Sequence, residues 1–108
     1  MLSKRNRVNK KEVDEIFKSG SFINSPNLTF KYLFKKGILE SKISFISPKS
    51  ISKKAVIRNK LRRIGYNILK KHIKHLPSGL IGVFVFKKYQ DDVFIIENEI
   101  KTIFSKIN

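Results

Sequence analysis

The hydrophobic positions in the middle of the chain recur with the period of an amphipathic helix. They step by four, three and four residues, which at about 100° per residue places them within a narrow arc. These positions are Ile57, Leu61, Ile64 and Ile68. The pattern predicts a helix over residues 53–75. A turn containing Pro77 and Gly79 follows, and the apolar run after it predicts a buried strand over residues 80–87.

The first half of the chain predicts another helix and two strands. Asn9, followed by Glu12 three residues later, has the spacing of a capping box and predicts a helix over residues 9–19. Residue types typical of strands follow at 28–33 and 42–47. The Lys-Lys-Gly sequence between these two segments predicts that they pair as an antiparallel hairpin.

A last helix is expected after Asp91 or Asp92, either of which can cap it. Its apolar side chains should point back at the sheet, with Glu97 and Glu99 outside. These apolar residues are Phe94, Ile95, Ile100, Ile103, Phe104 and Ile107. The element order is helix, two or three strands, helix, strand, helix, and the length suits one core. The chain is therefore expected to form a single α+β domain over residues 1–108.

The charge of the chain indicates a polyanionic partner. Lys and Arg number 24 against 8 acidic residues, which gives a net charge of +16 and a pI of about 10.3. Residues 41–90 contain thirteen Lys or Arg and no acid. Such a block repels itself unless a polyanion binds it. A Lys-, Ile- and Asn-rich coding habit is an alternative explanation for the composition, but it would not remove the acids from one block.

The predicted central helix carries a basic face away from its apolar residues. Arg can grip a phosphate with two N–H groups, Lys supplies a movable charge, and amides add donors. This set suits phosphate oxygens better than base edges. The helix residues concerned are Arg58, Asn59, Arg62, Arg63, Tyr66 and Lys70. Lys53 and Lys54 extend the patch towards the start of the helix. An ordinary solvated face is the alternative, and the acid-free surroundings argue against it.

No active site borne by the protein is evident. The chain has no Cys, no Gly-x-Ser-x-Gly sequence and no glycine-rich phosphate loop. His72 and His75 could share a metal, but a surface pair beside a phosphate site is the simpler reading because they stand among lysines. The longest apolar run is too short to span a bilayer, and no signal-peptide pattern follows the basic N-terminus. We therefore expect a cytoplasmic protein with no membrane partner.

Residues 47–63 resemble the signature of the protein component of bacterial ribonuclease P. They read as a basic loop ending in Lys-Ala-Val, followed by Arg-Asn-Lys and further basic residues on a helix. The opening of the chain is similar to the same family, with Arg-Asn-Arg at 5–7 and a helix that runs into Ile-Phe-Lys-Ser-Gly-Ser-Phe at 16–22. The Leu-Pro-Ser-Gly turn at 76–79 also matches. The likeness extends over nearly the whole chain.

The resemblance implies both a fold and a function. The fold is a two-layer α/β sandwich with a small mixed sheet, the element order α-β-β-β-α-β-α and a left-handed β-α-β crossover, which is the less common hand. The function is that of a protein subunit that joins a catalytic RNA to remove the 5′ leader of precursor tRNA. The RNA would carry the active site and use Mg²⁺. No protein-bound metal and no stable protein partner are expected.

The resemblance also implies site residues. The family contacts its catalytic RNA through positions that match Arg58, Asn59, Lys60, Arg62 and Arg63, with Lys53 and Lys54 as a basic approach. It holds the single-stranded leader between the first helix and the sheet, at positions that match Val13, Phe17 and Lys31.

This chain departs from the family at four of the positions compared. Lys60 replaces the usual Arg and loses its two-pronged fork. Val13 and Lys31 stand where aromatic residues are common, which reduces stacking on leader bases, although Lys31 could contact a phosphate. Tyr66 stands where Arg is frequent, and its ring could stack on a nucleotide.

The same features bear on three other functions. A ribosomal or general structural RNA-binding protein would share the charge and the size, but it would not need aromatic residues opposite the basic helix. A helix that binds an anionic membrane would insert its apolar stripe into the bilayer, but here that stripe is expected to cover the sheet. A DNA-binding regulator lacks support because there is no helix-turn-helix pattern.

Overall fold

A mixed four-stranded sheet carries three α-helices in the computed structural model, which describes residues 6–107. Arg5 of the N-terminal Arg-Asn-Arg sequence lies outside the described residues. The element order confirms the expected α-β-β-β-α-β-α arrangement. In chain order the elements are α1 (Lys10–Ser19), β1 (Ser21–Asn24), β2 (Leu28–Phe34), β3 (Lys42–Ile46), α2 (Ala55–Lys70), the short 3-10 helix η2 (Ile73–His75), β4 (Leu80–Phe86) and α3 (Val93–Ser105).

The strands lie in the order β1-β2-β4-β3, and this order corrects the predicted hairpin. β2 does not pair with β3. It pairs antiparallel with β1, across the turn at 25–27, and antiparallel with β4. β3 is a parallel neighbour of β4, reached through α2, so the β-α-β crossover is present. The reason is burial. Six of the seven β4 residues are buried, and such a strand needs a partner on each side.

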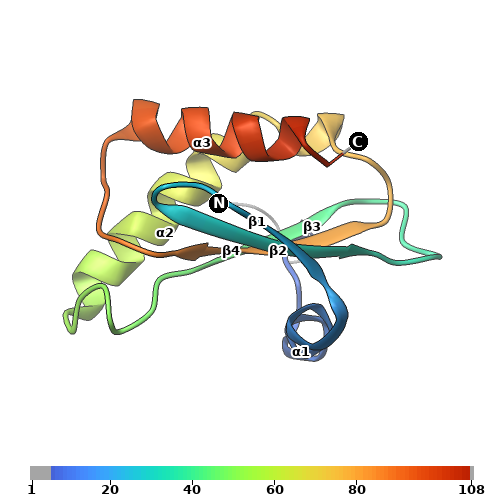
Figure 1. Ribbon diagram of the computed structural model, residues 1–108, viewed down its shortest axis with the longest axis horizontal. Helices are drawn as coiled ribbons and strands as arrows, with labels where there is room; N and C mark the ends of the chain where they lie inside the picture. Colours follow the sequence, from blue (N-terminus) through green and yellow to red (C-terminus); the bar gives the residue numbers. More distant parts are fainter. Residues whose placement is uncertain (1–5, 108) are drawn as a thin grey trace.

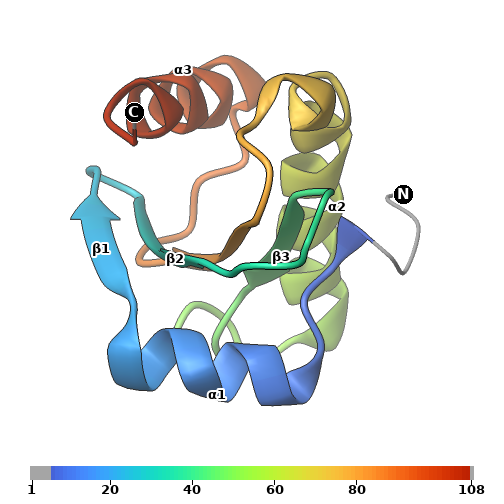
Figure 2. The ribbon, with the colours of Figure 1, turned by 90° about the vertical axis from the view of Figure 1, so that its right-hand side faces the viewer.

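Helices lie on both sides of the sheet. α3 covers one face, α2 flanks the β3 edge on that side, and α1 crosses the other face (Figure 1, Figure 2). The larger core lies between the sheet and the α2 and α3 helices. Its centre is a stack in which the Phe84 ring lies 4.3 Å from Phe30 and 5.0 Å from Phe45, centroid to centroid. A smaller cluster of Ile16, Ile81 and Val83 fixes α1 to the other face.

The α2 helix ends five residues before the predicted boundary. The N–H groups of Lys71 and His72 bond to carbonyls three residues back, so the chain tightens and continues as η2. Ile73 and Leu76 still pack on the larger core after this change. The hydrophobic period therefore persists beyond the α-helix, which is why the sequence pattern overestimated its length.

The α3 helix is capped as expected but faces the sheet with different residues. The Asp92 carboxylate accepts hydrogen bonds from the N–H groups of Phe94 and Ile95. Phe94, however, is 78% exposed and Ile95 42%, so their predicted contact with the sheet is wrong. Ile96, which the prediction omitted, is fully buried. The buried residues of this helix are Ile96, Glu99, Ile100 and Ile103. The side that faces the sheet therefore starts at Ile96, after the apolar run of the sequence has already begun.

Glu99 is buried rather than exposed, which is a second correction on α3. It is 9% exposed and accepts hydrogen bonds from the turn between β1 and β2. The donors are the Ser25 hydroxyl, the Asn27 N–H at 2.9 Å and the Asn27 side-chain amide at 2.5 Å. The carboxylate thus satisfies the polar groups of a turn far away in sequence. Glu97 is also largely covered, because His72 and Lys71 lie against it.

Within residues 6–107, none of the helices combines the length and the apolar character needed to cross a membrane.

Candidate nucleic-acid interface

The α2 helix sits close to the sheet edge because Gly65 allows it. A Cβ on Gly65 would lie about 2.5 Å from ring carbons of Phe45 on β3. The next residue, Tyr66, is drawn into the same contact: its ring meets Phe45 edge-to-face at 5.1 Å, and its hydroxyl accepts a hydrogen bond from the Phe45 N–H at 3.1 Å. Tyr66 is only 6% exposed. This burial leaves little of the ring accessible for the predicted stacking on a nucleotide.

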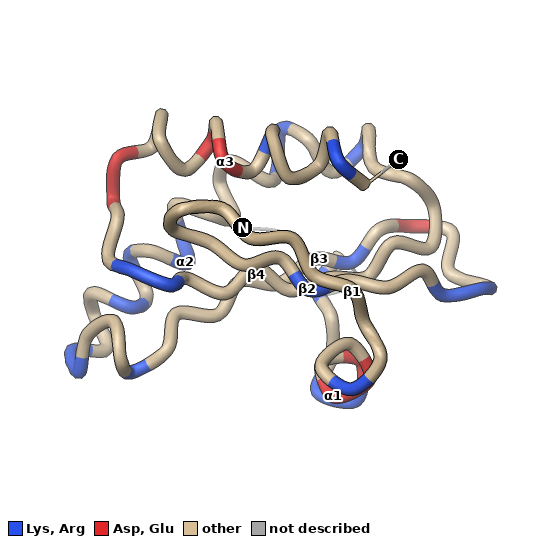
Figure 3. The backbone as a smooth tube through the Cα atoms, viewed as in Figure 1, with Lys and Arg blue, Asp and Glu red and all other residues tan. Residues whose placement is uncertain are grey.

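Seven of the nine predicted RNA-binding residues are exposed. They are Lys53, Lys54, Asn59, Lys60, Arg62, Arg63 and Lys70. Five of them lie on α2 and two on the loop that enters it, and α2 itself carries no acid. Figure 3 shows Lys and Arg along α2 and its entry loop, with the nearest acidic residues on the segment that leads into α3. Most of the predicted basic residues are therefore accessible on α2 and its entry loop.

Arg58 has a structural contact that sequence reasoning did not foresee. Its guanidinium Nη1 donates to the carbonyl oxygens of Ser52 and Lys53, each at 2.9 Å. These bonds fold the entry loop back onto the first turn of α2. Arg58 thereby holds Lys53 and Lys54 beside the helix, and it supports the basic face from a half-buried position.

Lys60 is paired with an acid from another part of the chain. Its Nζ lies 3.1 Å from Asp91 Oδ2, and the same oxygen accepts a hydrogen bond from the Tyr89 hydroxyl at 2.9 Å. The Tyr89 hydrogen bond, followed by the one from Lys60, lowers the pKa of Asp91. The Asp91 hydrogen bond raises the pKa of Lys60. The pair is therefore ionised at neutral pH, and only acid strong enough to protonate a carboxyl of lowered pKa breaks it.

Replacing Asp91 by Asn should strengthen binding of an RNA ligand by roughly threefold, because it releases Lys60 and removes a negative charge next to α2. The check is the dissociation constant for a structured RNA at fixed salt. Asp14→Asn, which removes an exposed acid from α1, is the matched control. Equal effects from both variants would show that only net charge matters. Between pH 6 and 8 the Asp91 effect should be constant, since the pKa of this carboxyl is lowered.

A basic hollow of about 390 Å³ opens beside α2. It is lined by Arg7, Asn59, Arg62, Arg63 and Tyr66. Arg62 also donates to the Asn59 side-chain oxygen. Arg7 comes from the segment before α1 and was not among the predicted site residues. Its place in the Arg-Asn-Arg opening was the only sequence signal, and that signal does not reveal which element Arg7 faces.

The three predicted leader residues lie on the α1 side of the sheet. Phe17 is 48% exposed, and the Lys31 Nζ lies 4.5 Å from the centre of its ring, a cation–π contact. Val13 is partly buried against the Ile16 cluster. Phe22 was missed: it pairs in register with Lys31 and is 63% exposed, so it adds a second open ring on this face.

His72 has an acidic partner on α3. His72 Nε2 lies 3.3 Å from Glu97 Oε2, and this hydrogen bond is the main cause that lowers the pKa of Glu97. In the described part of the chain, residues 6–107, no three potential His, Asp or Glu ligands are grouped as a metal site.

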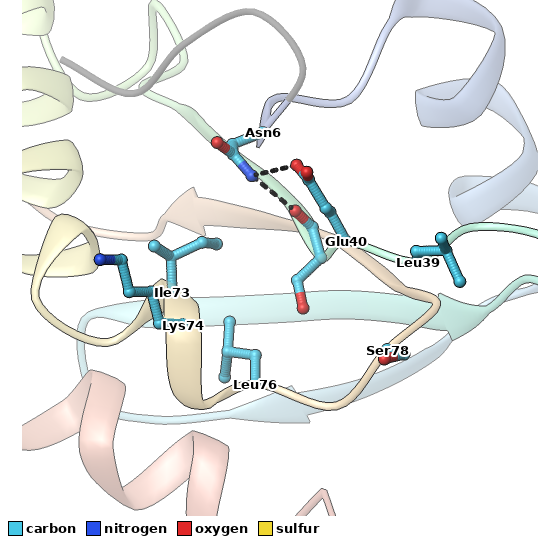
Figure 4. Close-up of a pocket in the computed structure, with 8 residues that line it drawn as sticks. Asn6, Leu39, Glu40, Ile73, Lys74, Leu76 and Ser78 are labelled. Atoms are coloured by element: carbon cyan, nitrogen blue, oxygen red, sulfur yellow. Dashed lines mark hydrogen bonds between the residues drawn. The ribbon is translucent and has the colours of Figure 1, made fainter.

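A second hollow, also about 390 Å³, lies at the far end of α2 (Figure 4). Leu39, Ile73 and Leu76 give it an apolar wall, and Glu40 and Lys74 give it opposite charges. The Asn6 amide bridges to the Glu40 carboxylate and the Ser41 carbonyl, each at 3.3 Å. This mixed lining is unlike a phosphate site. The hydrogen bonds of Asn6 in this hollow hold the start of the described chain in place.

The chain matches a known protein family. A model of the family described as Ribonuclease P matches residues 2–108. The chain belongs to the Ribonuclease P family. Membership connects it with tRNA processing and RNA binding, and with a role in a ribonuclease complex. A search among curated proteins found no match.

Solved Ribonuclease P proteins share the fold. The RNase P protein from Thermotoga maritima superposes with a TM-score of 0.83 at 19% identity, over 94% of this chain and 97% of that one. Two structures of the RNase P protein from Staphylococcus aureus give TM-scores of 0.79 and 0.74, at 17% and 21% identity. They cover 93% and 100% of this chain, and 93% and 98% of theirs. At these identities the likeness establishes the Ribonuclease P protein fold.

Proposed function

We propose that this chain is the protein subunit of a ribonuclease P holoenzyme, which binds the catalytic RNA through α2 and the 5′ leader of precursor tRNA through the α1 face. The observation that carries the proposal is the set of exposed basic residues on α2 and its entry loop, which themselves contain no acidic residue. A family match over nearly the whole chain supports it. Phosphate oxygens are the groups that such a surface of Arg, Lys and Asn binds best.

The proposed division of labour follows from electrostatics. A catalytic RNA and a precursor tRNA are both polyanions, and their association is opposed by repulsion that Mg²⁺ only partly offsets. A body of net charge +16 between them reduces this repulsion. In the proposal the RNA holds the catalytic Mg²⁺ and the active site, and the protein contributes affinity without catalytic residues. The cytoplasmic location expected from the sequence remains part of the proposal.

A cleavage assay with the cognate RNA tests this function. The purified chain alone should cut no precursor tRNA. Together with the RNA it should remove the leader at low Mg²⁺, where the RNA alone is slow, and the apparent precursor affinity should rise. If Mg²⁺ dependence and precursor affinity were the same with and without the protein, the chain would be an RNA-binding protein of another kind, such as a ribosomal one.

Truncating Phe17 should weaken the contact with the leader selectively. We expect Phe17→Ala to lower the affinity of the holoenzyme for a precursor with a long leader by about tenfold, because stacking of a base on an aromatic ring is worth about 1–3 kcal/mol. The measurement is the dissociation constant in Ca²⁺, which avoids turnover. A precursor with a one-nucleotide leader should bind the variant and the wild type equally.

A matched control for Phe17 is available on the opposite face of the sheet. Phe34 is 53% exposed, and its ring meets Tyr32 on the α3 side. Phe34→Ala should leave the affinity for either precursor unchanged. If Phe17→Ala weakened both precursors, or if both variants behaved alike, the α1 face would not be the leader site.

A further inference from the structure

We infer that Arg7, Arg62 and Arg63 form a pocket for consecutive phosphate groups of the catalytic RNA, with Arg7 as a binding residue supplied from outside α2. This inference rests on the proposed function and extends it to a residue that does not belong to the basic helix. The hollow has a volume of about 390 Å³, and none of the five residues that line it is acidic.

The charge of the pocket is the first argument. Three positively charged arginine side chains line one small space. Like charges held together in this way repel unless an anion lies between them. The Asn59 amide, bonded to Arg62, adds a polar group at the rim. Guanidinium forks match phosphate oxygens in geometry, and several forks around one space suit adjacent phosphates of a backbone.

The rigidity of the Arg7 segment is the second argument. Asn6 is held by Glu40 and the Ser41 carbonyl (Figure 4). The Val8 N–H donates to the Ser44 hydroxyl at 3.0 Å, on β3. The next residue is then fixed by the reciprocal capping box at the start of α1. Arg7 thus projects from a segment that is anchored on both sides, so its contribution does not require a loop to order on binding.

The position of this segment also links the two proposed RNA sites. The residues that anchor Arg7 also begin α1, the helix that carries Phe17. A phosphate held by Arg7 therefore stabilises the segment from which the leader-binding helix starts. Contact with the catalytic RNA and presentation of the leader surface share one stretch of backbone.

Arg7→Ala, Arg7→Lys and Lys11→Ala make the test series. Lys11 is an exposed cation four residues away on α1, and it does not line the pocket. The measurement is the dissociation constant of each variant for the catalytic RNA across a salt series, without precursor.

Arg7→Ala should weaken binding about tenfold and reduce the log–log salt slope by about 0.7–0.9, the loss of one phosphate contact. Arg7→Lys should recover the slope but only part of the affinity, since it lacks the fork. Lys11→Ala should match the wild type.

Failure of the phosphate pocket and failure of the proposed function would give different results. If Arg7→Ala and Lys11→Ala behaved alike while charge reversal on α2 abolished binding, the pocket would be wrong and the proposed function would stand. If charge reversal on α2 also had no effect, the proposed function would fail. Thermal unfolding of each variant verifies its fold.

A last experiment measures thermal unfolding with sodium pyrophosphate at constant ionic strength. If pyrophosphate stabilised the wild type but not Arg7→Ala, and Arg7→Ala still bound RNA normally, the pocket would be a site for free phosphate. That result would overturn the inference.

Discussion

Replacing Arg62 and Arg63 together by Glu should weaken binding of the catalytic RNA by about a hundredfold or more. Each arginine is exposed on α2 and lines the basic hollow. Losing two charged hydrogen bonds to phosphate costs about 3–6 kcal/mol, and reversal adds repulsion. The dissociation constant at fixed ionic strength measures the effect. Arg58 is not a suitable target, because its bonds to Ser52 and Lys53 hold the entry loop and its loss would disturb the fold.

Lys101→Glu with Lys106→Glu is the control for this double reversal. Both lysines are exposed near the end of α3, and the pair changes the net charge by the same amount. If RNA binding depends on the α2 surface, the control should weaken it only slightly, by lowering the overall attraction. Equal losses in the two double variants would mean that the protein binds RNA through its total charge and not through α2.

Phe84→Ala should destabilise the protein by about 3–5 kcal/mol, a large share of the 5–15 kcal/mol that is typical of domains. Phe84 is fully buried on the central strand β4. Its ring lies between Phe30 and Phe45, and the Phe104 ring meets it edge-to-face with 5.6 Å between the ring centroids. Removing it leaves a cavity at the point where β2, β4 and α3 meet. The free energy of unfolding from a urea titration measures the loss.

Phe94→Ala is the matched control, since Phe94 is 78% exposed on α3. The same substitution there should change the free energy of unfolding by less than about 0.5 kcal/mol. A comparable loss at the two positions would mean that part of the protein covers Phe94 in solution.

Features that depend on neighbouring residues could be predicted from the sequence. Asn9 and Glu12 cap each other across a single turn, so the start of α1 follows from their spacing alone. The Asp92 cap of α3 is equally local. The apolar stripe of α2 indicated its buried side, and the residues opposite that stripe are mostly exposed and basic. The predicted RNA-binding face came from this same periodicity.

Features that depend on distant residues could not be predicted in this way. The Lys-Lys-Gly turn favours a hairpin between β2 and β3, but pairing was decided by the burial of β4, whose residues come much later in the chain. Glu99 is buried because a turn some seventy residues away needs acceptors. Tyr66 is buried because Gly65 brings α2 against Phe45. None of these partners is visible in the local pattern.

The candidate site shows the same limit. The exposed lysines and arginines of α2 follow from the helix period, but Arg7 joins them only because residues 6–9 are anchored to β3 and its preceding loop. The sequence does not indicate that Lys60 has an acidic partner, because its pairing with Asp91 depends on where the loop before α3 lies. Sequence patterns located the helix face, and tertiary contacts decided which of its side chains are available.

The strand order has a consequence for how the protein is made. β4 joins β2 to β3, and it is the last strand to leave the ribosome. Until it emerges, the hairpin of β1 and β2 and the separate strand β3 have unpaired edges, and α2 has no finished sheet to cover. Nascent chains that stop before residue 80 should therefore be protease-sensitive and prone to aggregate, whereas chains released beyond residue 105 should gain resistance in one step.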